Sequence, residues 1–401
     1  MGKPEIRFKG YTDEWEQRKL GDVLERRIEQ RQQSEEYPRL AFASGQGVIP
    51  LSERKTNNRE QLTKDEYTKK YLVTELNDIV YNPANVKYGA IDRNKCRRGL
   101  ISPIYVTFTT NEIPGFIERI VTSHDFQQRA LRFEEGTVTK RQSVNPEDLV
   151  TLDILVAPKR EEQQKIATYF DSLDHLITLQ QRKCDEVKSL KKYMLQKMFP
   201  QNEQKVPEIR FEGFTEAWEQ RKFGDLVEKY EDPVVTPTEG YTRLGIRSHA
   251  KGTFHSYVEK GKELETAKMF RVASDKFIVN ITFGWEHAVA ITDENDAGKL
   301  VSHRFPQYSF NAGMIPKFFR YLILDKKFKH HLELSSPGGA GRNRVLKLSD
   351  MLEYKMNFPC EEEQRKIAAY FDDLDHLITL HQQKCEELKK IKKFMLQKMF
   401  V

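Results

Sequence analysis

Residues 165–179 read "KIATYFDSLDHLITL" and residues 366–380 read "KIAAYFDDLDHLITL", so one segment is written twice with two differences in fifteen positions. The match extends in both directions, and 29 of 39 positions are identical between 161–199 and 362–400. A second pair lies upstream, where 15 of 22 positions match between 4–25 and 207–228. Self-similarity on this scale indicates that one structural unit is written twice.

The sequence between the repeated segments differs between the two halves. "GVIPLSERKTNNREQLTKDEY", from Gly47, has no counterpart in "GTFHSYVEKGKELETAKMF", from Gly252. Short strand-like runs such as 100–108 and 276–283 alternate with helix-like runs at 113–131 and 314–334, punctuated by Gly and Pro. We therefore expect two mixed α+β heads, built on one plan for different tasks, on a repeated scaffold.

The repeated scaffold segments have the pattern of long helices. Neither 161–199 nor 361–400 contains Pro or Gly, and each begins with acidic residues and ends in lysines, as the helix dipole favours. Apolar residues recur at alternating spacings of three and four, which is typical of a coiled-coil seam. The predicted seam residues are Ile166, Phe170, Leu173, Ile177, Cys184, Val187 and Met194, with Ile367, Phe371, Leu374, Ile378, Cys385, Leu388 and Met395 in the second copy.

Connectivity and charge predict that the two helices pair antiparallel. The first helix ends at the second head and the second helix begins there, so a pair must run in opposite directions. Residues 160–180 hold four acids and two bases, whereas 181–199 hold six bases and two acids, so antiparallel pairing sets acid beside base. About 40 residues give a rod of roughly 60 Å. The arrangement is circular and pseudo-twofold, and Phe400 and Val401 should lie close to the N-terminal segment.

Composition excludes several classes of protein. The chain has 401 residues and a net charge of +6, with no run of eighteen apolar residues and no secretory signal at its start, so we expect a cytoplasmic protein without a membrane span. The four cysteines form no CxxC pair, so we expect no metal site. Cys184 and Cys385 are interpreted as small buried seam residues, with a disulfide or reactive thiol as the alternative.

Motifs for catalysis are absent from the sequence. Asp171, Asp174 and His175 in "DSLDH" are compatible with a metal or acid–base site, but their place on a coiled coil without an evident cavity favours a helix surface. The Gly-rich runs at 45–47 and 337–341 fit neither a P-loop nor a dinucleotide-binding turn. "YNPAN", from Tyr81, departs from an amino-methyltransferase motif, and no nuclease or helicase motif is found. We therefore expect a protein that is not itself an enzyme.

Basic, loop-like stretches occur in both heads, and their Arg, Lys, Asn and Gln side chains can contact phosphates or base edges. The alternatives are ordinary solvated loop surface and, for Trp285, a place in the core. The candidate DNA-binding residues are Arg39, Ser44, Lys87, Arg93, Arg97, Arg98, Lys140, Arg141 and Gln142 in the first half and Arg243, Arg247, Lys251, Trp285, His287, Arg342, Asn343 and Arg344 in the second.

Over essentially its whole length the sequence resembles the specificity subunit of bacterial type I restriction–modification systems. The motifs that carry this resemblance are "WEQRKLGDVLE" at 15–25 with "WEQRKFGDLVE" at 218–228, and "EEQQKIATYFDSLD" at 161–174 with "EEEQRKIAAYFDDLD" at 361–375. The resemblance implies target-recognition domains at 1–158 and 201–359 and spacer helices at 159–200 and 360–401. The implied fold is α+β, with two DNA-recognition heads joined by two long antiparallel helices.

The resemblance also implies a function and partners. Each head would read one half of a bipartite, asymmetric site in double-stranded DNA, and the helices would set the spacer between the halves. Two methyltransferase subunits, carrying S-adenosylmethionine for adenine methylation, and restriction subunits using ATP and Mg²⁺ would dock on a subunit that holds no cofactor of its own. The alternative is a protein–protein scaffold with two binding heads on a coiled-coil rod.

Overall fold

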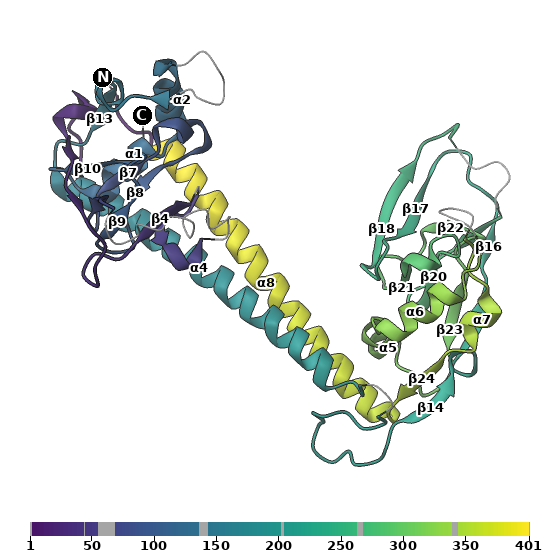
Figure 1. Cartoon of the computed structure of the whole chain (residues 1–401). Helices are drawn as coiled ribbons and strands as arrows, with labels where there is room; N and C mark the ends of the chain where they lie inside the picture. The colour runs from purple at the N-terminus through teal and green to yellow at the C-terminus, as the bar shows by residue number, and fades with distance from the viewer. Residues whose placement is uncertain are drawn as a thin grey trace. The chain divides into compact units, whose positions relative to one another are not determined.

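The computed structural model describes residues 2–43, 45–54, 69–135, 143–201, 204–262, 268–338 and 344–400. The chain forms two compact units (Figure 1). Unit 1 comprises Met1–Arg182 and Gln382–Val401, and unit 2 comprises Lys183–His381. Each unit thus combines one head with parts of both long helices.

The head of unit 1 is built on a four-stranded antiparallel sheet with the order β2-β10-β7-β8. Its strands are β2 (Leu24–Arg27), β7 (Ile79–Tyr81), β8 (Ile91–Arg93) and β10 (Val106–Thr110). Smaller sheets pair β1 (Glu16–Lys19) with β13 (Asp153–Val156), β4 (Leu40–Ala43) with β5 (Gly47–Pro50), β11 (Glu134–Glu135) with β12 (Ser143–Val144), and β3 (Gln30–Arg31) with β6 (Tyr71–Thr74) and β9 (Gly99–Ile101). Its helices are α1 (Pro114–Val121), α2 (His124–Ala130) and α3 (Pro146–Leu149).

The head of unit 2 repeats this four-stranded sheet as β15-β23-β20-β21, from β15 (Val227–Tyr230), β20 (Lys276–Val279), β21 (Val289–Ile291) and β23 (Gln307–Phe310). A five-stranded sheet follows the order β16 (Pro233–Val234), β19 (Met269–Arg271), β22 (Leu300–Ser302), β17 (Tyr241–Ile246) and β18 (Thr253–Val258). β14 (Glu219–Lys222) pairs with β24 (Lys355–Phe358), and the helices are α5 (Pro316–Leu322), α6 (Lys326–Leu334) and α7 (Leu348–Leu352). The prediction of two α+β heads built on one plan is confirmed.

Each helix-like run of the heads divides into two short helices. Ser123 caps α2 by accepting a hydrogen bond from the Phe126 amide, and Asp325 caps α6 in the same way from the Lys327 amide. A side-chain oxygen at this position satisfies an amide that would otherwise lack an intrahelical partner, so it starts a new helix. The two caps explain why an apparently continuous apolar pattern bends at the same place in both heads.

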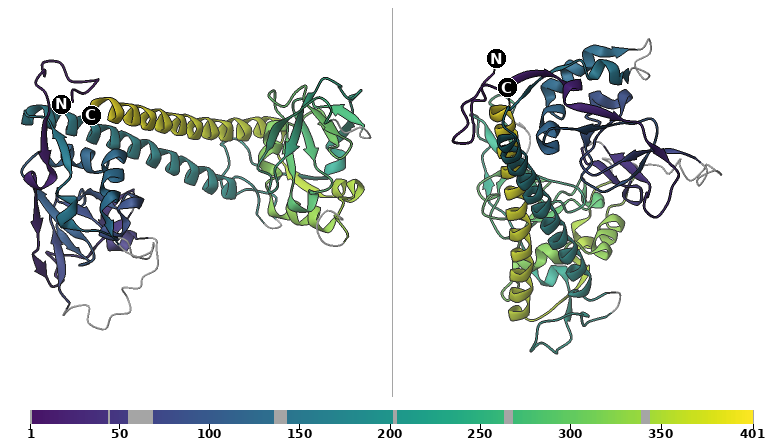
Figure 2. Two further views of the ribbon diagram at one scale, coloured as in Figure 1. Left: turned by 90° about the horizontal axis from the view of Figure 1, so that it is seen from above. Right: turned by 90° about the vertical axis from the view of Figure 1, so that its left-hand side faces the viewer.

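The long helices are α4 (Arg160–Lys197) and α8 (Glu361–Met399), and they pair antiparallel within each unit (Figure 2). In unit 1, Lys392 pairs with Asp174, and Cys385 Sγ lies 3.9 Å from Gln181 Oε1. From the first contact to the second, the residue number rises along α4, from 174 to 181, and falls along α8, from 392 to 385, so the two helices run in opposite directions. In unit 2 the equivalent Lys191 pairs with Asp375 at 2.5 Å. The predicted antiparallel pairing is therefore present in both units.

The predicted seam residues are buried or half-buried on both helices. The first turns of each seam also enter a head. Phe170 belongs to the core of unit 1 and lies 6.1 Å from the ring of Phe400, while Phe371 lies 6.0 Å from the ring of Phe199 in unit 2. The seam therefore joins helix to helix and helix to head. Cys184 and Cys385 are buried free thiols, as the seam interpretation requires.

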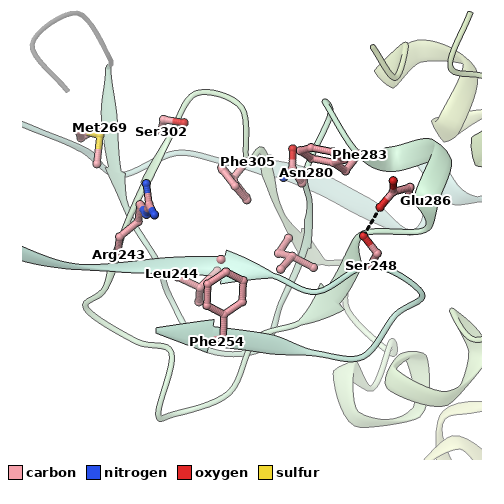
Figure 3. A pocket seen from close by; sticks show the side chains of 12 residues that line it. Arg243, Leu244, Ser248, Phe254, Met269, Asn280, Phe283, Glu286, Ser302 and Phe305 are labelled. Atoms are coloured by element: carbon pink, nitrogen blue, oxygen red, sulfur yellow. Dashed lines mark hydrogen bonds between the residues drawn. The ribbon is translucent and has the colours of Figure 1, made fainter. Parts of the chain in front are cut away.

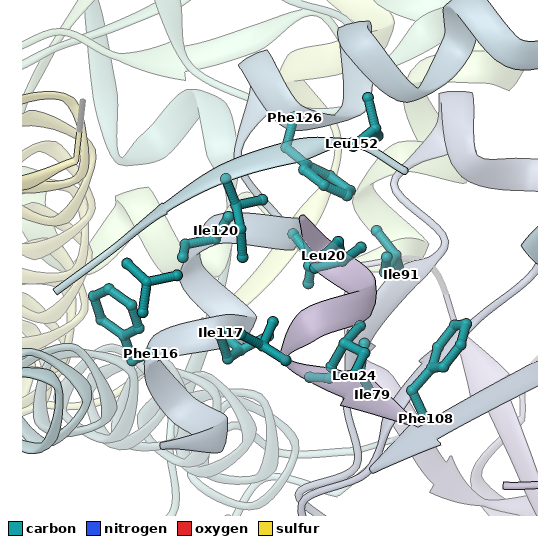
Figure 4. Packing of buried hydrophobic residues seen from close by; sticks show 14 of the residues in the cluster. Leu20, Leu24, Ile79, Ile91, Phe108, Phe116, Ile117, Ile120, Phe126 and Leu152 are labelled. Carbon is teal, nitrogen blue, oxygen red and sulfur yellow. The ribbon is translucent and has the colours of Figure 1, made fainter. Parts of the chain in front are cut away.

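The end of the chain completes the core of unit 1. Figure 4 shows part of this core, in which Phe116 and Ile117 of α1 pack with strand residues such as Ile79. The ring of Trp15 lies 5.7 Å from that of Phe400, and the Ile6 amide donates to the Lys398 carbonyl at 2.9 Å. The predicted closeness of Phe400 to the N-terminal segment is confirmed, and Val401 lies outside the described residues.

A buried ion pair at the start of each long helix explains part of the repeated sequence. Arg7 holds Glu162 of α4 through two hydrogen bonds, at 2.6 and 2.8 Å, and Arg210 holds Glu363 of α8 at 2.7 and 2.8 Å. Both carboxylates are fully buried. The negative charge lies in the first turn, where it also suits the helix dipole. Each head is thereby fixed to the beginning of one helix.

The glutamines that follow these glutamates form a second attachment. Gln163 accepts from the Ile113 amide at 3.1 Å and donates to the Ala157 carbonyl at 2.8 Å. Gln364 makes the equivalent bonds to Ile315 and Pro359, at 3.0 and 2.9 Å. Because a buried amide must be paired on both its oxygen and its nitrogen, these bonds define the approach of each head to its helix.

The carboxylates of "DSLDH" anchor the first head to the middle of α4. Arg93 donates to both oxygens of Asp171 at 2.7 Å. Arg119 donates to Asp171 at 2.8 Å and to Asp174 at 3.0 Å, and Lys392 of α8 also reaches Asp174. These contacts make both carboxylates structural anchors. Within the residues that the structure describes, no cluster of three His, Cys, Asp or Glu side chains is placed to hold a metal ion.

The second head uses a tyrosine where the first uses arginines. The Tyr321 hydroxyl donates to Asp372 at 2.9 Å and to Asp375 at 3.1 Å. Burial, together with the negative charges of these two carboxylates, raises the pKa of Tyr321, so the hydroxyl stays protonated as a donor. The repeated carboxylates therefore meet different partners in the two heads, which is where the sequences diverge.

We expect Arg210→Ala to destabilise unit 2 by about 3–5 kcal/mol, because the substitution leaves Glu363 buried without its partner. Denaturant unfolding monitored by tryptophan fluorescence measures the change. Arg221→Ala is the matched control, since the side chains of Arg221 and Glu219 are 49% and 62% exposed and such pairs contribute about 0.2–1 kcal/mol. Equal losses in the two variants would contradict a stabilising role for the buried pair.

A second substitution tests the anchor at Asp174. Burial is the largest influence and raises the pKa of Asp174, but the Lys392 hydrogen bond and the charges of Arg119, Lys392 and Lys95 outweigh it, so the pKa lies below its ordinary value. A carboxyl with a lowered pKa stabilises the fold above its unfolded pKa of about 3.9, and this contribution disappears as the pH falls through the folded value.

We therefore expect Asp174→Asn to lower the free energy of unfolding of unit 1 by about 1–3 kcal/mol at pH 7. The difference from wild type should shrink as the pH drops below about 4. Urea titrations across pH 3–7 measure it. Asp125→Asn, whose carboxylate is 77% exposed, is the control and should change stability by less than about 0.5 kcal/mol. A difference that does not depend on pH would argue against the ionised carboxylate as the anchor.

Candidate nucleic-acid interface

A buried asparagine presents the basic loop of the first head. Asn94 is fully buried, and its amide nitrogen donates to Thr74 Oγ1 at 3.1 Å, to the Glu75 carbonyl at 2.9 Å and to the Arg97 carbonyl at 3.0 Å. Its amide oxygen accepts from the Cys96 amide at 3.0 Å. The buried Asn94 side chain thus holds the backbone of the loop "NKCRRG", and the arginine side chains of the loop remain exposed to solvent.

Arg97 and Arg98 are the exposed members of this loop. The guanidinium of Arg98 lies 5.4 Å from the ring centre of Tyr37 and donates to Glu75 and Glu36, at 2.9 and 2.8 Å. Exposed ion pairs of this kind are weak, so a phosphate can replace the carboxylates. The two side chains form an accessible basic surface in unit 1.

Two candidates of the first head are held by contacts within unit 1. Arg39 is 7% exposed, and its guanidinium stacks 3.5 Å from the ring centre of Tyr71. The Arg93 guanidinium forms ion pairs with Glu118 and Asp171. Desolvation lowers the pKa of Arg93, but the two carboxylates outweigh this effect and raise it, so the guanidinium stays charged. These contacts give both arginines a role in holding the fold.

The second head brings three of its predicted segments together. In "IRSHAKG", the His249 amide donates to the Glu286 carbonyl and the Ala250 amide to the His287 carbonyl, each at 2.8 Å. These bonds tie the β17–β18 turn to "FGWEH". The guanidinium of Arg344 lies 5.2 Å from the ring centre of Trp285 in that segment. Residues that are almost a hundred positions apart therefore share one surface of unit 2.

The side chains on this surface differ in their accessibility. Arg243, Arg247 and Lys251 are exposed, and Trp285 and Arg344 are half-buried. Arg344 donates to the carbonyls of Ser336 and Glu333, at 3.1 and 3.0 Å.

His287 is buried, and its Nε2 lies 2.8 Å from the Ile323 carbonyl. Burial is the main cause that lowers its pKa, so this imidazole is neutral at pH 7 and serves the core. The accessible charges of the surface are therefore those of Arg243, Arg247 and Lys251.

The remaining candidates lie outside the described part of the chain. Ser44, Lys140, Arg141, Gln142, Arg342 and Asn343 fall in segments that the structure does not describe, and the same holds for the side chain of Lys87. Their assignment stays a prediction.

Sequence reasoning missed a pocket beside the basic turn of unit 2 (Figure 3). Phe254, Phe283 and Phe305 line it together with Asn280. Three separate segments contribute these side chains, around residues 254, 280–283 and 305, and no sequence spacing links all three. The sequence signals near it were the candidate Arg243, which lines the pocket, and "FGWEH", which contributes Phe283 and Glu286. Among the described residues, no helix has the length and apolar character needed to cross a membrane.

Comparisons with known proteins agree with this architecture. Residues 215–390 match the family model described as type I restriction modification DNA specificity domain. A protein of Methanocaldococcus jannaschii named as the specificity subunit of the type I restriction enzyme MjaX is 24% identical over 294 residues. That match covers 71% of this chain and 66% of the relative's length.

A solved structure shares the fold. The crystal structure of the type I restriction–modification system S subunit from M. genitalium aligns with a TM-score of 0.59 at 14% identity, over 99% of both chains. The second half of the chain therefore matches the DNA specificity domain of type I restriction–modification systems, and the internal repeat extends the same motifs to the first half.

Proposed function

We propose that this chain is the DNA-recognition subunit of a type I restriction–modification complex and that each head reads one half of a bipartite site. The observation that carries the proposal is the repeat of one four-stranded sheet order in two heads whose loops differ. Equal scaffolds with unequal loops favour two different half-sites, so the site is asymmetric. The chain acts by binding, and catalysis belongs to its partners in the cytoplasm, where the DNA lies.

Accessible basic side chains support binding to double-stranded DNA. Arg97 and Arg98 extend from unit 1, and Arg243, Arg247 and Lys251 from unit 2. Such side chains neutralise phosphates, and arginine can also read the O6 and N7 of guanine in the major groove. The loops that would contact the target bases differ in sequence between the two heads, so each head would recognise its own half-site.

Two equivalent apolar patches on the long helices support docking of two copies of one partner. In unit 1 the exposed side chains are Leu176, Ile391 and Phe394, at 41%, 43% and 51% exposure. In unit 2 the equivalents are Leu377, Leu190 and Tyr193, at 42%, 44% and 48%. Exposed apolar groups at repeated positions are typical of interfaces.

We assign these patches to two methyltransferase subunits. Those subunits would bring S-adenosylmethionine for adenine methylation, and restriction subunits would add ATP- and Mg²⁺-dependent cleavage. No cofactor is proposed for this chain itself.

A protein–protein scaffold is the alternative function. The two readings differ in salt dependence, because each phosphate contact makes log affinity fall with log salt by a slope of about 0.9. A scaffold for proteins has no such dependence of DNA binding.

Methylation mapping tests the function directly. Cells that express this chain with its cognate methyltransferase subunit should acquire one new bipartite, asymmetric motif of methylated adenine, which defines both half-sites and the spacer. Absence of new methylation, with the two proteins expressed and associated, would overturn the proposal in favour of the scaffold.

Substitutions in single heads should each weaken one half-site. We expect Arg97→Ala to weaken binding through unit 1 and Lys251→Ala binding through unit 2. A lost base contact reduces discrimination at that half-site, whereas a lost phosphate contact decreases the salt slope by about 1. Binding is measured with duplexes in which one half-site is scrambled. Each variant is the control for the other, and equal losses at both half-sites would contradict separate heads.

Lengthening both long helices should lengthen the preferred spacer. One heptad inserted after Lys183 and another after Gln383 preserves the seam spacing and adds about 10 Å to each helix. At about 3.4 Å per base pair, we expect a spacer about three base pairs longer in the methylation map. A heptad in α4 alone is the control, because it mismatches the pair. An unchanged spacer in a folded, active complex would show that the helices do not set it.

A further inference from the structure

A pocket of about 340 Å³ opens in unit 2 between the β17–β18 hairpin and the segments around Asn280, Glu286 and Phe305 (Figure 3). Three phenylalanine rings line it, from Phe254, Phe283 and Phe305. Its volume is at the lower end of the roughly 300–1,000 Å³ found for small-molecule sites. The pocket is therefore of a size for one small, largely apolar ligand.

Backbone geometry determines where the Phe254 ring lies. The ring covers Gly245 of the neighbouring strand so closely that a Cβ at this position would come within 2.3 Å of it. Only glycine allows the ring to lie against the strand, which leaves its other side to the pocket. The far end is closed by a hydrogen bond from the Ser248 hydroxyl to Glu286.

The polar groups of the pocket can recognise hydrogen-bonding edges. Asn280 accepts from the Thr282 amide at 3.0 Å through its side-chain oxygen, so its amide nitrogen is the group that can donate to a ligand. The Glu286 carboxylate is an acceptor at the same end, and Arg243 is a donor at the other. A flat ligand with donors and acceptors on its rim fits this arrangement.

The surroundings of the pocket favour a nucleic acid as the source of that ligand. Arg243 lines it and is exposed, and the guanidinium of Arg247 lies 5.5 Å from the ring centre of Phe254. Aromatic faces stack on nucleobases regardless of sequence, while nearby arginines neutralise the phosphodiester.

We propose that this pocket takes one unstacked nucleobase from the half-site that unit 2 reads. The inference rests on the proposed function and adds to it a recognition step inside the protein. A base leaves the duplex at a cost that is smallest when its complement is missing. Duplexes that lack one complementary base should therefore bind more tightly at the position that enters the pocket, and at normal affinity or less elsewhere.

The test uses the complex of this chain with its methyltransferase subunits and duplexes that carry the mapped site. Each base of the unit 2 half-site in turn is placed opposite an abasic position, and affinity is measured at fixed salt. We expect a gain of about tenfold at one position. Phe283→Ala, which removes a stacking ring, and Ser302→Phe, which fills the pocket from its rim, should each abolish that gain.

Phe270→Ala is the matched control. Phe270 packs, half-buried, against the same core cluster as Phe283 and Phe305 but does not line the pocket, so this variant should keep the gain. Unchanged discrimination at the unit 1 half-site verifies that each variant is folded and assembled.

The outcomes separate the two proposals. Specific binding of the intact duplex without a gain at any position would overturn the pocket proposal and leave the proposed function intact. A gain that persists in Phe283→Ala and Ser302→Phe would place the unstacked base elsewhere in the complex and also overturn it. Failure to bind any duplex specifically would overturn the proposed function, and the pocket proposal with it.

Discussion

The structure depends on an ion pair that occurs twice between the long helices, as Asp174 with Lys392 and as Asp375 with Lys191. Each pair joins the acidic first half of one helix to the basic second half of the other, so only the antiparallel direction brings the partners together. The pairs are partly buried, where opposite charges attract more strongly than at an open surface. The same aspartates also receive donors from the heads, so one residue fixes both helix to helix and helix to head.

This arrangement makes each unit dependent on distant sequence. The core of unit 1 includes Phe400, and that of unit 2 includes Phe199. Each of these phenylalanines lies just beyond the C-terminal end of a long helix. A head therefore cannot bury its own tryptophan, Trp15 or Trp218, with local residues alone. The circular closure follows from packing rather than from the order of elements, since the chain must return to complete its first core.

In each head, different parts of the structure provide the stable scaffold and the surface proposed for recognition. The central strands of their four-stranded sheets are buried, and both sheets keep one strand order. Their loops are held by individual polar contacts, such as those of Asn94 in unit 1 and of the His249 amide in unit 2. A loop held by side-chain and turn hydrogen bonds can change its outer residues without changing the core. That freedom lets two equivalent units present different surfaces, and in unit 2 it leaves a pocket beside the basic turn.

The sequence by itself determined the repeat, the two long helices, their antiparallel direction and the α+β class, because identity, heptad spacing and charge asymmetry are local properties of the chain. It also placed Arg97, Arg247 and Lys251 among exposed basic residues. Only the tertiary structure decided that Arg39 and His287 are buried, against Tyr71 and Ile323, and that Arg93 is engaged by Asp171, since these partners come from other segments. The same holds for the pocket, whose walls come from five segments that meet only when the five-stranded sheet of unit 2 forms.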